Sequence, residues 1–276
     1  MKAFQFTIEM TSRALTDAYT ILHNGDEHIG AKNSDEKLQR YVVDRVKNDN
    51  QCWWITSGDP CEYIQRNDPR FESGNIPDWF TFGMMSDPVK YQIQRYTDIY
   101  SPIGDKCLAS TLGNHDFSLM KYNSRDVYTE LWDSMKLPKE RRFGIDGFLR
   151  LRFVYAGKVF WKQTIYIHHG VAGGRNKSAI MNELERMPQL AEADVYCLGH
   201  AHKKIVSSDE YSAMDSVTNR IVRRRRYYSA TGSYVSGVSQ DDEIGSWAER
   251  MHFYPQALGP IEIKFYPNAK KVEMLT

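Results

Sequence analysis

Apolar and polar residues alternate from Phe4 to Ile8, which is the period of a half-buried β-strand. Short apolar runs predict further strands at residues 19–22, 52–56, 107–111, 149–153, 159–167 and 195–198. Between them, apolar residues three or four positions apart predict helices around residues 38–46, 89–100, 127–135 and 180–187. Asn33 and Glu36 are placed as a capping box for the first helix, and Asp87-Pro88 should begin the second. Strands that alternate with helices indicate an α/β fold.

The segment from Pro60 to Ser86 interrupts this pattern. It has no clear periodicity and is rich in Pro, Asp, Gly and Trp, so we expect a long active-site loop or a small insertion. From Lys203 onward the chain suggests β structure with long loops. Nothing between the elements has the composition of a flexible linker, and a single domain over residues 1–276 is therefore expected.

Composition narrows the class of protein. The 276 residues are 41% hydrophobic and 26% charged, with a formal net charge of +1, so overall charge would not draw the protein to nucleic acid or to an anionic membrane. The four cysteines are scattered and lack CxxC spacing, which argues against both a disulfide framework and a thiolate zinc site. The sequence shows neither the apolar stretch of a signal peptide nor a transmembrane run. We expect a cytoplasmic protein with no membrane partner.

Five predicted strands each run into a loop that carries side chains able to bind a metal. The loops are Asp26-Glu27-His28, Gly58-Asp59, Gly113-Asn114-His115-Asp116, His168-His169-Gly170 and Gly199-His200-Ala201-His202. They contain six of the 8 histidines in the chain. Ligands bind at the carboxyl ends of strands in open α/β sheets, so these loops should meet. Imidazole, carboxylate and amide groups without thiolate suit Mn, Fe, Zn, Ni or Co better than a structural zinc ion.

In this order the five loops resemble the signature of the calcineurin-like metallophosphoesterases, which runs DxH, GDxx, GNH[D/E], Hx[G/P] and GHxH. The resemblance spans Asp26 to His202. It implies a four-layer αββα sandwich of two mixed β-sheets flanked by helices. It also implies two divalent transition-metal ions at the strand ends, with Mn favoured over Fe, Zn, Ni and Co. The HHG loop followed by Gly173-Gly174-Arg175 further resembles compact, phage-encoded members of the family.

The resemblance also assigns roles to individual residues. One metal would be held by Asp26, His28 and His202, the other by Asn114, His168 and His200, and Asp59 would bridge the two. A carboxylate suits the bridging position because its two oxygens can span cations about 3.5 to 4 Å apart. His115 would protonate the leaving oxygen or stabilise the phosphoryl oxygens, and Asp116 would hold the His115 ring by a hydrogen bond.

Two adjacent histidines at the end of a strand point to opposite faces, so only one of His168 and His169 should bind metal. Alignment of residues 164–167 with the strand of the family favours His168. His169 would then face the substrate or the core.

Two arginine-containing segments offer weaker indications. Arg175, with the backbone N–H groups of the loop before it, could hold a phosphate, and a plain glycine-rich loop passing close to the metals explains the sequence equally well. Arg223–Arg226, followed by Tyr227 and Tyr228, could bind a polynucleotide, but a solvated sheet edge protected by charge is the better explanation.

The sequence therefore predicts a metal-dependent hydrolase of phosphate esters, and the favoured substrate is a phosphodiester in a nucleotide or nucleic acid. Gly58-Asp59 continues as Pro60-Cys61-Glu62, which departs from the phosphoprotein phosphatase pattern and disfavours a phosphoprotein substrate. Two alternatives stay open. One is a phosphomonoesterase acting on a small phosphorylated substrate, and the other is a non-catalytic, metal-stabilised binding module.

Overall fold

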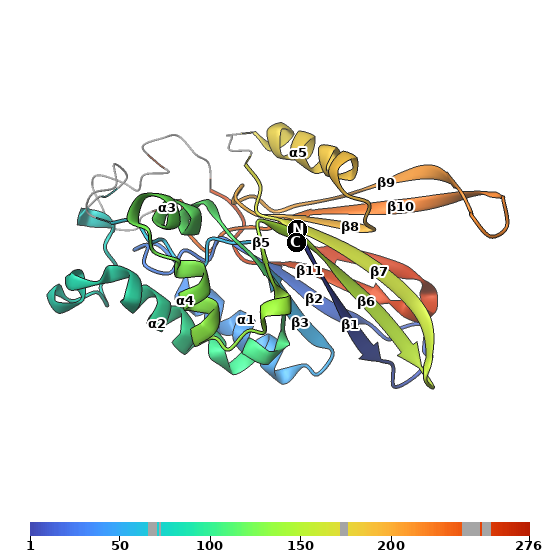
Figure 1. Ribbon diagram of the computed structural model, residues 1–276, viewed down its shortest axis with the longest axis horizontal. Coiled ribbons are helices and arrows are strands. Elements are labelled where there is room, and N and C mark those ends of the chain that lie inside the picture. The colour runs from blue at the N-terminus through green and yellow to red at the C-terminus, as the bar shows by residue number, and fades with distance from the viewer. Residues whose placement is uncertain (66–70, 72, 172–175, 239–248, 250–254) are drawn as a thin grey trace.

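Two mixed β-sheets face each other at the centre of the protein, as the computed structural model in Figure 1 shows. The structure describes residues 1–65, 71, 73–171, 176–238, 249 and 255–276. Within them, one six-stranded sheet has the order β1 (Lys2–Glu9), β6 (Asp146–Tyr155), β7 (Lys158–His168), β8 (Val195–Leu198), β10 (Ile221–Ala230) and β9 (Ile205–Met214). The other has the order β12 (Lys271–Leu275), β11 (Ile261–Tyr266), β2 (Tyr19–Asn24), β3 (Cys52–Thr56), β4 (Cys107–Thr111) and β5 (Arg142–Gly144).

Helices cover the outer faces of both sheets (Figure 1). Against the sheet that contains β2 to β4 lie α1 (Glu36–Asn48), α2 (Pro88–Tyr100), α3 (Asn114–Asn123) and α4 (Val127–Ser134). Against the other sheet lies α5 (Lys177–Leu190). Short 3-10 turns occupy Ser73–Asn75, Phe82–Ser86, Ser101–Lys106, Lys139–Arg141 and Pro267–Ala269.

Three apolar clusters separate these layers. Val46 and Trp132 belong to the cluster between the helices α1 to α4 and their sheet. Ile55 and Ile165 belong to the cluster between the two sheets. Leu184 lies in the cluster that joins α5 to the other sheet. Burial of apolar side chains at each of these three boundaries drives the layers together, and the expected αββα sandwich is confirmed.

The alternation of side chains along β7 decides what reaches the space between the sheets. Ile165 and Ile167 pack in the cluster between the sheets, whereas Tyr166 packs in the cluster under α5. His168 ends the strand, in register with Leu198 of β8. Because successive strand side chains point to opposite faces, position 168 continues the α5 face and position 169 turns toward the other sheet.

The predicted strands and helices are confirmed in position, with two differences. The first helix is capped by Asp35, whose carboxylate accepts from the backbone N–H of Leu38 at 2.9 Å, and the proposed cap at Asn33 is wrong. The segment that begins at Asn114, expected to be a loop, is the start of α3. Val127 then begins α4 as expected.

Other expectations from the sequence concern the surface and the thiols. Arg223–Arg226 lie on β10 where it pairs with β9 alone, and the side chain of Arg225 forms an exposed ion pair with Glu210. This agrees with a solvated, charge-protected ribbon, which Figure 1 shows extending away from the helices.

The four cysteines are all free and buried. Among the described helices, none is long and apolar enough to cross a membrane.

Candidate metal centre

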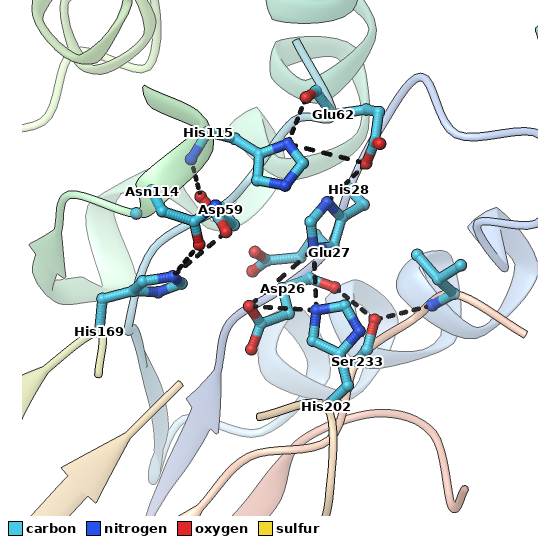
Figure 2. A network of polar contacts seen from close by, with 12 residues as sticks. Asp26, Glu27, His28, Asp59, Glu62, Asn114, His115, His169, His202 and Ser233 are labelled. Carbon is cyan, nitrogen blue, oxygen red and sulfur yellow. Dashed lines mark hydrogen bonds and ion pairs between the residues drawn. The ribbon is translucent and has the colours of Figure 1, made fainter. Parts of the chain in front are cut away.

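The five metal-capable loops converge where the two sheets meet at the carboxyl ends of their strands (Figure 2). Asp26 and His28 follow β2, Asp59 follows β3 and Asn114 follows β4, which are parallel neighbours in one sheet. His169 follows β7, and His200 and His202 follow β8, which are parallel neighbours in the other sheet. Parallel pairing therefore brings residues far apart in the sequence to one place.

Asp26, His28 and His202 form the first group of possible ligands, with one ligand atom from each lying within 4.8 Å of the others. The Nε2 atoms of His28 and His202 are 3.1 Å apart. Nε2 of His202 is 3.6 Å from Oδ1 of Asp26, which is too long for a hydrogen bond. Both carboxylate oxygens of Asp26 are buried without a hydrogen-bond partner among the described residues. A buried carboxylate of this kind is costly unless a cation neutralises it, so the group fits a metal ion.

Asp59, His169 and His200 form the second group of possible ligands. Nδ1 of His169 lies 2.6 Å from the backbone oxygen of Ser57, and because a carbonyl oxygen only accepts, Nδ1 carries the hydrogen. Nε2 then faces Oδ2 of Asp59 at 3.2 Å and Oδ1 of Asn114 at 3.0 Å. A nitrogen lone pair directed at two acceptor oxygens is unfavourable unless a proton or a metal cation lies between them.

The pKa values of this second group report the same demand for positive charge. Burial lowers the pKa of His169, but the adjacent Asp59 carboxylate outweighs burial and raises it to about 10. Burial raises the pKa of Asp59, but His169 and His115 outweigh burial and hold it well below its ordinary value. Without metal, a proton on His169 supplies the positive charge, and a divalent cation would displace it.

His115 lies between the two groups, and its ring packs edge to face on the ring of His28 with centroids 4.7 Å apart (Figure 2). Its backbone N–H donates to Oδ1 of Asp59 at 2.9 Å. Nδ1 of the ring lies 2.5 Å from the backbone oxygen of Glu62, so it carries the hydrogen and fixes the ring. The expectation that Asp116 orients this ring differs from the structure. Oδ2 of Asp116 instead accepts from the N–H of Gly113 at 2.8 Å and caps α3.

Glu62 contacts two histidines of the site, and the sequence did not single it out. Its Oε2 lies 2.7 Å from Nδ1 of His28, which leaves Nε2 of that ring directed at the first group. Burial raises the pKa of Glu62, but His115 and His28 outweigh burial and lower it to about 2. The available signal was a carboxylate three residues after Asp59, in a segment without periodicity.

The backbone is strained at five of the candidate ligands. Asp26, His28, Asp59, His200 and His202 have φ between 47° and 64°. This left-handed region is unfavourable for residues with a Cβ, and such conformations persist where the surrounding structure enforces them. Their concentration in three of the five loops indicates that side-chain placement, rather than local backbone preference, determines these turns.

Gly113 allows β3 and β4 to bring their loops together. A Cβ at this position would overlap Oδ1 and the backbone nitrogen of Asp59. Gly58 has a φ of +100°, and a Cβ there would lie 2.7 Å from the backbone nitrogen of Gly113, so a side chain at this position would be both strained and crowded. The two glycines let the Asp59 carboxylate lie directly against the N-terminus of α3.

Among the predicted site residues, the structure brings together Asp26, His28, Asp59, Asn114, His115, His200 and His202. It does not bring in His168, whose Nδ1 accepts from the N–H of Gly170 at 2.7 Å on the α5 side. His169 occupies the position expected for His168, because the inward-facing positions of β7 are the odd-numbered ones. Arg175 lies outside the described residues.

Comparison with known proteins agrees with this arrangement. The family description "Calcineurin-like phosphoesterase" matches residues 18–204, which include all five loops. No curated protein sequence matches the chain. A metallophosphoesterase from Sphaerobacter thermophilus is similar in structure, with 14% identity, a TM-score of 0.37, and coverage of 92% of this chain and 87% of that one.

Two further solved structures are similar at the same level. A predicted phosphoesterase from Streptococcus pneumoniae has 12% identity and a TM-score of 0.34, covering 95% of this chain and 91% of that one. GAP50, described as the anchor in the inner membrane complex of Plasmodium, has 11% identity and a TM-score of 0.46. The match covers 90% of this chain and 81% of that one. The sequence match, which covers more than half of the chain, carries the assignment: the protein belongs to the calcineurin-like phosphoesterases, a family of metal-dependent hydrolases.

Proposed function

We propose that this protein hydrolyses phosphodiesters, of the kind found in nucleotides and nucleic acids, with two divalent metal ions. The observation that carries the proposal is the position of Asp59, which shares one group of possible ligands with His169 and His200 and another with His28 and His115. A carboxylate between two sets of imidazoles is suited to neutralising two neighbouring cations.

One cation would be held by Asp26, His28 and His202, and the other by Asn114, His169 and His200, with Asp59 shared. This is the set expected from the sequence, except that His169 takes the place of His168. When bound, the two cations would supply the positive charge that activates a water molecule and stabilises the phosphoryl oxygens. Among first-row metals we favour Mn²⁺, since carboxylate and amide oxygens stand beside the imidazoles.

His115 supports catalysis over a purely structural metal site. Its Nδ1 donates to the backbone oxygen of Glu62, so proton exchange with a substrate would take place at Nε2. In the protonated ring, Nε2–H can donate to the leaving oxygen as the ester bond breaks. A metal-stabilised binding module would not require such a group.

The buried carboxylates of the site would neutralise part of the charge of two divalent cations. Burial raises the pKa values of Asp26, Asp59 and Glu62, but neighbouring histidines outweigh burial and hold them below their ordinary range. We retain the diester, favoured from the sequence, over a monoester, and an assay of both ester types tests this choice.

The test is turnover of bis-p-nitrophenyl phosphate by metal-free protein reloaded with Mn²⁺, with p-nitrophenyl phosphate assayed in parallel. We expect the diester to be hydrolysed with the higher kcat/KM. Asp59→Asn should lose both activity and bound metal, whereas His115→Ala should lose activity and keep both metals by elemental analysis. Absence of turnover with Mn²⁺, Ni²⁺, Co²⁺ and Zn²⁺ alike would falsify the enzymatic proposal.

A further inference from the structure

A cavity of about 350 Å³ lies beside the candidate metal centre and is lined mainly by residues between Glu62 and Gln92. The segment that forms it is the one that interrupts the regular pattern of the sequence, between β3 and α2. A volume of this size is within the range of pockets that bind small molecules. Gln92, a lining residue that is 4% exposed, is held in place because its Oε1 accepts from the backbone N–H of Tyr63 at 2.8 Å.

Glu62 connects the cavity to the metal centre. It lines the cavity, and its Oε2 lies 2.7 Å from Nδ1 of His28 and 3.9 Å from Nδ1 of His115. A phosphoryl group held by the candidate ligands would therefore have this cavity next to it. One of its two ester substituents could extend past Glu62 into the cavity.

The described lining residues favour an aromatic group with hydrogen-bonding edges. Phe71 and Phe80 supply aromatic surface, and Trp79 packs on the Phe80 ring with centroids 5.2 Å apart. Gln65 and Asn75 supply amides, which can both donate and accept. Among the described lining residues Glu62 is the charged one, and it is paired with His28.

We propose that this cavity binds the nucleobase of the nucleotide whose phosphodiester is cleaved. A base has flat faces for the phenylalanines and both donors and acceptors for the amides, which is how unpaired bases are recognised in pockets. A base held in this way is not paired with another strand. The substrate is therefore a mononucleotide diester or an unpaired nucleotide in a single strand. This inference rests on the proposed phosphodiesterase function.

The test compares esters that release the same p-nitrophenol leaving group from the full-length, Mn²⁺-loaded protein. These are methyl p-nitrophenyl phosphate, phenyl p-nitrophenyl phosphate, and the 5′-p-nitrophenyl phosphates of thymidine and guanosine. We expect kcat/KM to be at least about tenfold higher for one or both nucleoside esters than for the methyl ester, with the phenyl ester between them. A phenyl ester cleaved as well as the better nucleoside ester would overturn recognition of a base.

Two substitutions test whether the cavity causes the preference for nucleoside esters. Asn75→Leu removes the amide at similar volume, and Phe80→Leu removes the aromatic face. Each should reduce the preference for the nucleoside ester over the methyl ester at least about fivefold. Phe82→Leu is the matched control, since Phe82 is 94% exposed, lies two residues from Phe80 and does not line the cavity. It should keep the preference of the unmodified protein.

The outcomes separate the two proposals. If no ester is hydrolysed, the phosphodiesterase function fails, and the pocket fails with it. If all esters are hydrolysed without preference for a nucleoside, or if Asn75→Leu and Phe80→Leu leave the preference unchanged, only the nucleobase pocket is overturned. A preference for the nucleoside ester that lies in KM rather than in kcat would agree with a pocket that binds the substrate away from the reacting atoms.

Discussion

The carboxylate of Glu62 accepts from Nδ1 of His28 at 2.7 Å, while the backbone oxygen of the same residue lies 2.5 Å from Nδ1 of His115. One residue thus orients two imidazoles of the site, one through its side chain and the other through its main chain. The two functions can be separated by mutation, because substitution of the side chain leaves the backbone oxygen in place.

Replacement of Glu62 by leucine should weaken Mn²⁺ binding by about 10- to 100-fold, because a histidine ligand loses the acceptor that fixes its ring and tautomer. Glu62→Gln retains an acceptor oxygen and should lose less. Isothermal titration of metal-free protein with Mn²⁺ measures the effect directly, whatever the substitution does to the adjacent cavity. Glu140→Gln, at an exposed position, is the control. Equal Mn²⁺ affinity in Glu62→Leu and the unmodified protein would contradict the orienting role.

The adjacent histidines provide a second prediction. His169→Ala removes an imidazole that faces Asp59 and Asn114, and should lower activity by about 100-fold or more together with bound metal. His168→Ala removes a side chain on the opposite face of β7 and should retain both metals and most of the activity. Elemental analysis and kcat/KM are measured on the same preparations. Metal loss in the His168 variant, with retention in the His169 variant, would restore the assignment expected from the sequence.

The choice between His168 and His169 shows what the sequence could decide. The five motifs identify the loops. They do not show which of the two histidines faces inward, because that depends on which face of the strand each preceding residue occupies. Ile165 and Ile167 pack between the sheets and Tyr166 packs under α5. The sequence does not distinguish these two faces, because a strand that is covered on both sides has apolar residues at successive positions.

Local sequence patterns did not predict the N-cap of α1 or the helix α3. Asp35 and Asn33 are both good N-cap residues, and only the start of α1 at Glu36 selects Asp35. The helix α3 has Leu119 as its buried apolar residue, while Phe117 is 54% exposed, so no helical period marks it. Glu62 is conspicuous only once the turn after Asp59 brings it to His28. Contacts between separate loops cannot be read from local periodicity.

His23 gives a prediction about pH. It is fully buried between the hydroxyls of Ser229, 2.7 Å from Nδ1, and Ser57, 3.1 Å from Nε2. Burial lowers its pKa from 6.5 to about 3. Below pH 6.5 the unfolded chain binds a proton at this position and the folded protein does not, so the contribution of neutral His23 to stability is lost as the pH falls toward 3.

Between pH 7 and pH 5 the loss should amount to roughly 2 kcal/mol of unfolding free energy. His23→Gln keeps a hydrogen-bonding side chain that does not titrate. The unfolding free energy of this variant should therefore not include this loss between pH 7 and pH 5. Urea unfolding of both metal-free proteins at the two pH values measures the difference. Parallel losses in the two proteins would show that His23 does not carry the effect.

The contact between Gly113 and Asp59 gives the last prediction. A methyl group at position 113 would overlap the Asp59 carboxylate and its backbone nitrogen, and neither can move without disturbing Gly58, which is itself at a φ of +100°. Gly113→Ala should therefore displace the shared carboxylate, lowering kcat/KM for bis-p-nitrophenyl phosphate by about 100-fold, as expected when a reacting group is misplaced by about 1 Å. Gly83→Ala is the matched control, because the nearest atom to its added Cβ is Oγ1 of Thr81 at 4.0 Å. Circular dichroism and thermal unfolding should show both variants folded, with the amount of bound Mn²⁺ reduced in Gly113→Ala alone. Full activity in Gly113→Ala would mean that Asp59 can retreat without consequence, which is incompatible with a carboxylate that holds two cations at once.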